Sequence, residues 1–161
     1  MFILLFLMLN SLTQELYLNF PLLYKKQLYC NLQDWMMNVK IDTKEKFTVI
    51  TPQENAFAAN MTGELNDLLL PYLQKGIPHI VLNMSLVGEV DDAAGECLAS
   101  IQQHFYENNC SFVICNLQKT AEVALDKQEL LEVMNVTPTE SEAWDIVQME
   151  EIERELLGDN E

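Results

Sequence analysis

The stretch Pro78–Gly95, PHIVLNMSLVGEVDDAAG, decides the fold that we predict for this chain. It contains Ile80–Leu82, a short apolar run without polar alternation, which is typical of a strand buried on both faces. The run is followed by loop-forming residues, namely Asn83, Ser85 and Gly88. A helix is expected from near Ala93, with Asp91 or Asp92 as its N-cap, because a carboxylate accepts backbone N–H bonds at that position. The stretch therefore predicts a strand, an acidic turn and a helix in direct succession.

This succession resembles the STAS family, the domain shared by sulphate transporters and anti-sigma factor antagonists. The family signature is a strand of the type VVLDLS, a loop, and Asp-Ser-Ser-Gly at the opening of the second helix. In this chain Ile80–Ser85 (IVLNMS) matches the strand, and Asp92–Gly95 (DAAG) matches the motif. The order of elements over residues 37–155 also fits. The resemblance implies an α/β fold, with a single mixed β-sheet of about five strands and about four helices packed mainly on one side.

The resemblance also implies a partner-binding site at the start of this helix, formed by Asp91, Asp92, Ala93, Ala94, Gly95 and Glu96. Gly95 and the two alanines would leave the backbone open to a partner, and nearby apolar contact would come from Leu86, Val87 and Val90. A solvated acidic loop with one helix cap is the alternative interpretation.

The chain departs from the family at the residues that carry its regulation. In anti-sigma factor antagonists the serine after the motif aspartate accepts a phosphate that abolishes partner binding. Here that position is Ala93, and the next serine is replaced by Ala94, so we predict no phosphorylation switch at the usual site. Asp91 beside Asp92 would mimic part of a phosphoserine's charge. Whether the protein is thereby held in the binding or the released state stays open.

Hydrophobic periodicity predicts the other elements of the domain. Two strands around Val39–Ile41 and Phe47–Ile50 read as a hairpin. The residues 52–55 are expected to end the hairpin, and one long helix is expected after Asn55, to about Lys75, with these residues on its apolar face: Phe57, Met61, Leu65, Leu68, Leu69, Tyr72 and Leu73. The helix that opens near Ala93 is expected to run to Tyr106, and a parallel crossover then leads to a strand over 111–117. After this strand we expect a helix over 120–134, an edge strand at Val136, and a last helix.

The last helix is predicted to begin at Thr139, because Thr139–Glu142 has the spacing of a capping box. Trp144 is expected in the core, and the inner helix face is expected to hold Ala143, Ile146, Val147, Met149, Ile152 and Leu156. Residues 140–161 contain nine acidic residues against one basic residue, Arg154, for a net charge of −8. These acids either form a solvated face and tail or dock a basic partner.

The chain is predicted to have three parts: an N-terminal extension (1–36), a STAS-like domain (37–155) and an acidic tail (156–161). The extension opens with an apolar run of about nine residues, which is too short to span a bilayer. We interpret it as sequence upstream of a true start at Met36 or Met37. A membrane-anchoring segment or a signal peptide are the alternatives, and a membrane would be a partner only if the extension is translated.

Composition narrows the function further. A net charge of −16 argues against nucleic acid as a partner, because binding phosphate requires Lys and Arg. The cysteines have no metal-ligand spacing and are expected to be small buried thiols of a reducing cytosol: Cys30, Cys97, Cys110 and Cys115. His79 and His104 are isolated, so we assign no catalytic residue, metal, cofactor or small-molecule substrate.

The resemblance therefore favours a non-catalytic cytoplasmic interaction domain in transcription regulation, whose partner is an anti-sigma factor or a kinase-like protein. One alternative is the STAS subunit of a phospholipid-transport ABC complex, which binds the ATPase; in that branch the motif also departs from Asp-Ser-Ser-Gly. A second alternative is an enzyme with a carboxylate or metal cluster at Asp91, Asp92 and Glu96. We reject the enzyme because no His, Cys, Lys or phosphate-binding loop accompanies the acids.

Overall fold

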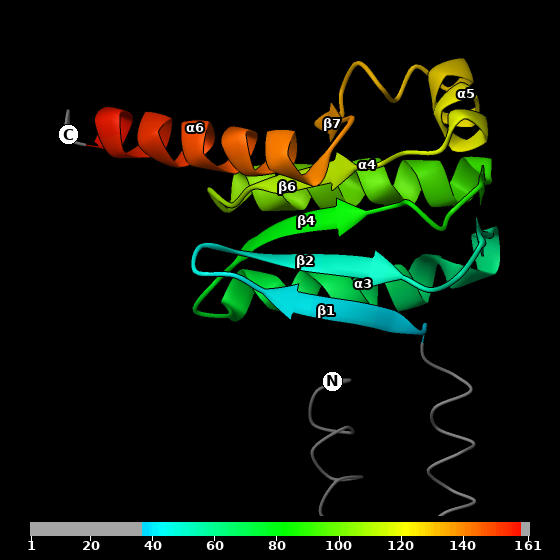
Figure 1. Cartoon of the computed structure of the whole chain (residues 1–161), viewed down its shortest axis with the longest axis horizontal. Coiled ribbons are helices and arrows are strands. Elements are labelled where there is room, and N and C mark those ends of the chain that lie inside the picture. Colours follow the sequence, from blue (N-terminus) through cyan, green and yellow to red (C-terminus); the bar gives the residue numbers. More distant parts are fainter. Residues whose placement is uncertain (1–36, 159–161) are drawn as a thin grey trace, which may run out of the picture. The chain divides into compact units, whose positions relative to one another are not determined.

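A five-stranded mixed sheet forms the centre of the structure, a computed structural model that describes residues 37–158 (Figure 1). Its strands, in spatial order, are β1 (Val39–Thr43), β2 (Phe47–Pro52), β4 (His79–Asn83), β6 (Phe112–Cys115) and β7 (Val136–Thr137). β1 and β2 form the predicted antiparallel hairpin, and the other neighbouring pairs are parallel. The predictions for residues 1–36, including Cys30 and the alternative start sites up to Met36, lie outside the described residues.

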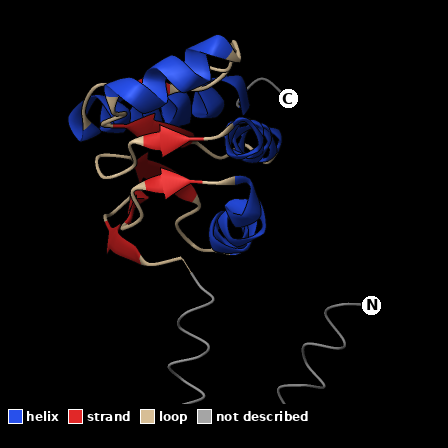
Figure 2. Cartoon of the chain, turned by 90° about the vertical axis from the view of Figure 1, so that its right-hand side faces the viewer, coloured by secondary structure: helices blue, strands red, loops and turns tan. Residues whose placement is uncertain are grey.

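Four α-helices surround this sheet: α3 (Thr62–Leu69), α4 (Asp92–Glu107), α5 (Lys119–Lys127) and α6 (Glu140–Gly158). α3 and α4 lie along one face, where Figure 2 shows them nearly end-on, and α6 packs on the opposite face. The predicted α/β class, with five strands and helices mainly on one side of a mixed sheet, is confirmed.

Strand β4 is buried on both faces, as its unbroken apolar run predicts. Ile80 and Leu82 are fully buried in the core that contains α3 and α4, whereas Val81 between them is fully buried against α6. The α6 side chains opposite Val81 are Ala143 and Val147, which are both fully buried. Because successive side chains of a strand point to opposite faces, a strand covered on both sides needs apolar residues at every position.

The long helix predicted between Asn55 and Lys75 is wrong in its first part and at its end. The segment instead forms β3 (Ala56–Phe57), the 3-10 turn η1 (Ala59–Met61), α3, and the 3-10 turn η2 (Leu70–Gln74). β3 pairs in parallel with β5 (Glu89–Val90) as a second small sheet, which places Phe57 beside Val90. Pro71, which lacks an N–H, explains why α3 gives way to a 3-10 turn.

The C-terminal helices also differ from their predicted bounds. α5 ends at Lys127 rather than Met134, and Glu129 has a positive φ of 58° where the chain leaves the helix direction. The N-cap of α6 is confirmed, because the Glu142 N–H donates to Thr139 Oγ1 over 3.2 Å. α6 continues to Gly158, so the helix extends into the range 156–161 that we predict as an acidic tail.

The predicted inner face of α6 is correct only over its first two turns. Ala143 and Val147 are fully buried and Ile146 is partly buried. The remaining members are exposed, with exposed fractions of 61% for Met149, 55% for Ile152 and 65% for Leu156. The distal turns of α6 contact the sheet through polar residues instead, since Arg154 donates to Ser111 Oγ over 2.6 Å.

The cysteines of the described part are mainly buried thiols, as predicted. Cys110 and Cys115 are buried, and Cys97 is partly buried on α4. Burial raises the pKa of Cys115 to about 12, so this thiol stays protonated at neutral pH.

His79 is predicted to make the stability of the fold depend on pH. Its Nδ1 accepts a hydrogen bond from the Ser111 N–H over 2.9 Å. Partial burial, assisted by the Arg154 charge, lowers the pKa of His79, although the nearby Glu150 and Glu151 oppose the shift. Since the unfolded chain then binds the proton more readily, the free energy of unfolding should fall as pH drops below about 6.5.

Urea unfolding between pH 7.5 and pH 5.5 would measure this effect, because carboxylates titrate mainly below that window. His79→Gln should flatten the pH dependence. His104→Gln should retain it, because His104 is exposed on α4. Equal pH dependence in the wild type and His79→Gln would contradict the assignment.

Candidate partner-binding surface at the start of helix α4

The loop between β4 and α4 is anchored to the interior of the protein. Met84 and Val87 are fully buried, and the Met84 N–H donates to the Cys115 carbonyl of β6 over 2.9 Å. At the end of the loop, the Asp91 N–H donates to the Phe57 carbonyl of β3 over 3.0 Å. Backbone hydrogen bonds to β6 and to β3 therefore hold the two ends of the loop that leads into α4.

Side chains and backbone from two further segments bind the same loop. The N–H groups of Gly88 and Glu89 both donate to the Asn55 carbonyl, over 2.9 and 3.3 Å. Gln118, which precedes α5, donates to the Ser85 carbonyl over 2.8 Å. A loop held by this many contacts loses little conformational entropy on binding, which favours it as a recognition surface.

Asp91 occupies the N-cap position of α4, but its side chain does not cap this helix. Its Oδ2 accepts a hydrogen bond from the Ala59 N–H over 2.8 Å, at the beginning of η1. The predicted side-chain cap is therefore wrong, and the carboxylate instead links two loops. Asp92 lies in the first turn of α4, where its negative charge stabilises the positive end of the helix dipole.

The predicted site residues divide into an exposed and a buried set. The exposed set, which we call the α4 surface, contains Asp91, Asp92, Ala93 and Glu96. Ala94 and Gly95 are buried, so the expectation that they leave the backbone open to a partner is wrong. A Cβ on Gly95 would lie 3.0 Å from Leu125 Cδ2, which shows that this position brings α4 close to the α5 region.

Fewer apolar side chains are exposed beside the α4 surface than the sequence predicted. Leu86 is 46% exposed, whereas Val87 and Val90 are buried in the core. Only one of the three side chains expected to touch a partner is thus accessible.

The α4 surface is acidic and lacks a compensating base. The ion pairs found within residues 37–158 involve other carboxylates, those of Asp42, Glu122, Glu150 and Glu151. The small side chain of Ala93 lies among the acids of the α4 surface and allows close approach. Within the same part of the chain, no three His, Cys, Asp or Glu side chains are placed to hold a metal ion. The surface is thus suited to recognise a cationic protein surface.

Comparison with protein-family models gives a match to the STAS domain over residues 38–143. The chain belongs to the STAS domain family. No curated relative matches this STAS domain by sequence. None of its helices between residues 37 and 158 has both the length and the apolar character needed to cross a membrane.

Solved structures share the STAS fold at low sequence identity. A putative anti-sigma factor antagonist from Thermotoga maritima is 19% identical with a TM-score of 0.57, over 68% of this chain and 94% of that one. An anti-sigma factor antagonist from Mycobacterium paratuberculosis is 12% identical with a TM-score of 0.61, over 70% and 94%. The murine anion transporter Slc26a9 is 15% identical with a TM-score of 0.53, over 77% of this chain and 24% of the transporter.

The position implied for the family's phosphoserine is Ala93, which the structure places on the exposed side of the first turn of α4. The exposed hydroxyl of Ser100 lies on the same side of the helix, about 10 Å further along it. The absence of a phosphorylation switch at the usual position remains a prediction.

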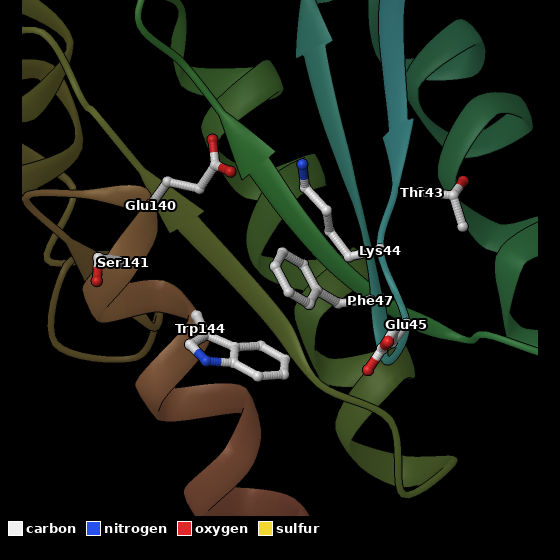
Figure 3. Close-up of a pocket in the computed structure, with 7 residues that line it drawn as sticks. All are labelled: Thr43, Lys44, Glu45, Phe47, Glu140, Ser141 and Trp144. Atoms are coloured by element: carbon white, nitrogen blue, oxygen red, sulfur yellow. The ribbon is translucent and has the colours of Figure 1, made fainter.

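A hollow on the other face of the STAS domain was missed by sequence reasoning (Figure 3). It is open, has a volume of about 770 Å³, and is lined by Thr43, Lys44, Glu45, Phe47, Glu140, Ser141 and Trp144. Trp144 is half-buried rather than in the core, and its ring lies 4.9 Å from that of Phe47. The β1–β2 hairpin and the α6 N-terminus are far apart in the sequence, so no local pattern could have indicated that they meet.

Proposed function

We propose that this STAS domain is a non-catalytic cytoplasmic interaction domain that binds a regulatory protein through the α4 surface. The observation that carries the proposal is the exposure of Asp92, Ala93 and Glu96 at the start of α4, after a loop that backbone hydrogen bonds hold in place. The buried free thiols agree with a reducing compartment. The fold shared with anti-sigma factor antagonists supports a role in transcription regulation.

The chemistry of the α4 surface defines the partner. A groove with Lys or Arg side chains would form charge-assisted hydrogen bonds to Asp92 and Glu96, and Leu86 would supply apolar contact beside them. Such bonds set orientation and association rate more than total affinity. The partner is either a kinase-like anti-sigma factor or the ATPase of a phospholipid-transport ABC complex. We retain the ATPase as the second candidate because residues 93 and 94 are alanines, whereas the family motif has serines at both positions.

Affinity capture from native lysate with the full chain tests the proposal. The wild type should retain a partner, and Asp92→Arg should reduce that capture at least about tenfold, because reversing a charge that faces a cation costs several kcal/mol. The identity of the retained protein by mass spectrometry separates an anti-sigma factor from an ABC ATPase.

Glu107→Arg is the matched control, since it makes the same charge reversal at the exposed far end of α4. Its capture should equal that of the wild type. Equal capture by Asp92→Arg and Glu107→Arg would place the partner on another surface and leave Asp92 as a residue that only stabilises the helix.

A further inference from the structure

The outward side of α6 carries a second exposed apolar face, distinct from the α4 surface. Met149, Ile152 and Leu156 are spaced by three and four residues, which places them on one side of a helix. They lie opposite Ala143 and Val147, which pack on the sheet, and more than half of each side chain's surface is exposed. We call Met149, Ile152 and Leu156 the α6 stripe. Since α6 and α4 cover opposite faces of the sheet, the two surfaces are separate.

Contacts on the inner side hold α6 so that the stripe faces outward. Lys46 of the β1–β2 hairpin binds Glu151 over 2.8 Å. Arg154 bonds Glu150 over 3.1 Å and Ser111 Oγ over 2.6 Å. In Figure 1 the C-terminal turns of α6 extend past the ends of the strands, so a partner has access to this part of the helix.

The charged residues beside the α6 stripe indicate which kind of partner it would bind. The exposed neighbours along α6 are acidic, namely Asp145, Glu153 and Glu155. Arg154, the single base of α6, is already bonded on the inner side. A second copy of the chain would place the same carboxylates opposite one another, and an anionic membrane surface would repel them as well. A cationic partner with apolar side chains satisfies both features of the stripe.

We propose that the α6 stripe docks a basic amphipathic helix of another protein. Its apolar side chains, spaced by three or four residues, pack against Met149 and Ile152, and its Lys and Arg side chains pair with the flanking acids. Two amphipathic helices that pair through their apolar faces, as in a coiled coil, recognise each other through such anchors spaced three and four residues apart. The interaction is predicted to weaken with salt, because the charged part of the contact stays exposed to solvent.

Fluorescence anisotropy with the full chain and a labelled synthetic peptide tests the proposal. The probe is a helical peptide with Leu at i, i+3, i+4 and i+7 and Lys on its other face. We expect wild-type protein to bind it, and Met149→Ser/Ile152→Ser to bind it at least about tenfold more weakly, since the double variant no longer buries two apolar side chains against the peptide. Leu86→Ser, in the exposed loop beside the α4 surface, should bind like the wild type.

Two further measurements exclude simpler explanations. A peptide with Gln in place of Leu should bind much more weakly than the probe, and equal binding would show attraction by charge alone and overturn the proposal. Unchanged affinity in Met149→Ser/Ile152→Ser, or no binding by the wild type, would also overturn it. Sedimentation that shows a wild-type dimer dispersed by the double variant would assign the stripe to self-association and reject the cationic partner.

Discussion

Replacing Phe105 by alanine is expected to lower the free energy of unfolding by about 3–5 kcal/mol. Phe105 is fully buried on α4, and its ring centroid lies 5.3 Å from that of Phe112 on β6, with a tilt of 44° between the rings. The substitution removes this aromatic pair and leaves a cavity between helix and sheet. For a domain with a total stability of about 5–15 kcal/mol, such a loss is at least about a fifth of the margin.

The adjacent residue provides the control for this prediction. Tyr106 is 77% exposed on the same helix, so Tyr106→Ala should change stability by no more than about 0.5 kcal/mol. Urea unfolding of the full chain measures both variants, and the melting temperature of Phe105→Ala should fall on the order of 10–20 °C. Similar stabilities for the two variants would mean that α4 does not pack on β6 through Phe105.

The central strands and α4 could be predicted because their signals are local. Ile80–Leu82 has apolar residues at every position, and only a strand covered on both faces makes use of them. The stripe of α4 has regular spacing and is buried throughout: Ala94, Leu98, Ile101 and Phe105. The cap at Thr139 was likewise contained in four consecutive residues.

The elements that sequence reasoning missed depend on partners distant in the chain. Phe57 fits the apolar spacing of the helix that follows it, but its pairing with Val90 draws it into β3. No helical pattern can reveal that pairing, since it forms between residues separated by a whole helix and strand. At the far end of α6, Met149 and Ile152 were assigned to the inner face, but they lie on the side of the helix opposite Ala143 and Val147 and are exposed.

At the candidate site, too, the sequence did not reveal contacts between residues that are distant in the chain. The motif located the start of α4 and the exposed acids Asp92 and Glu96. It did not reveal that the Asp91 carboxylate binds the Ala59 N–H, because that contact depends on where η1 lies. It also did not reveal that the side chains of Leu125 and Gln128 lie close to Gly95.

Gly95→Leu is expected to destabilise the fold by about 1–3 kcal/mol, which is typical of overpacking. An added Cβ would lie 3.0 Å from Leu125 Cδ2 and from Gln128 Oε1, and 3.1 Å from Leu130 Cδ1. These side-chain ends have some room to shift for a single methyl group, but an isobutyl group must displace them. Gln128 Oε1 is buried without a hydrogen-bond partner among the described residues, so an apolar side chain pressed against it gives no compensating bond.

The same substitution at Gly63 separates packing from helix propensity. Gly63 is exposed in α3 and has nothing within 4 Å of an added Cβ, so Gly63→Leu should be neutral or stabilise the fold by up to about 1 kcal/mol. Urea unfolding and partner capture should be measured on both variants. If Gly95 serves only to expose backbone to a partner, Gly95→Leu will keep wild-type stability and lose capture. A loss of stability relative to Gly63→Leu instead assigns the motif glycine to the contact between α4 and the α5 region, and leaves recognition to Asp92, Ala93 and Glu96.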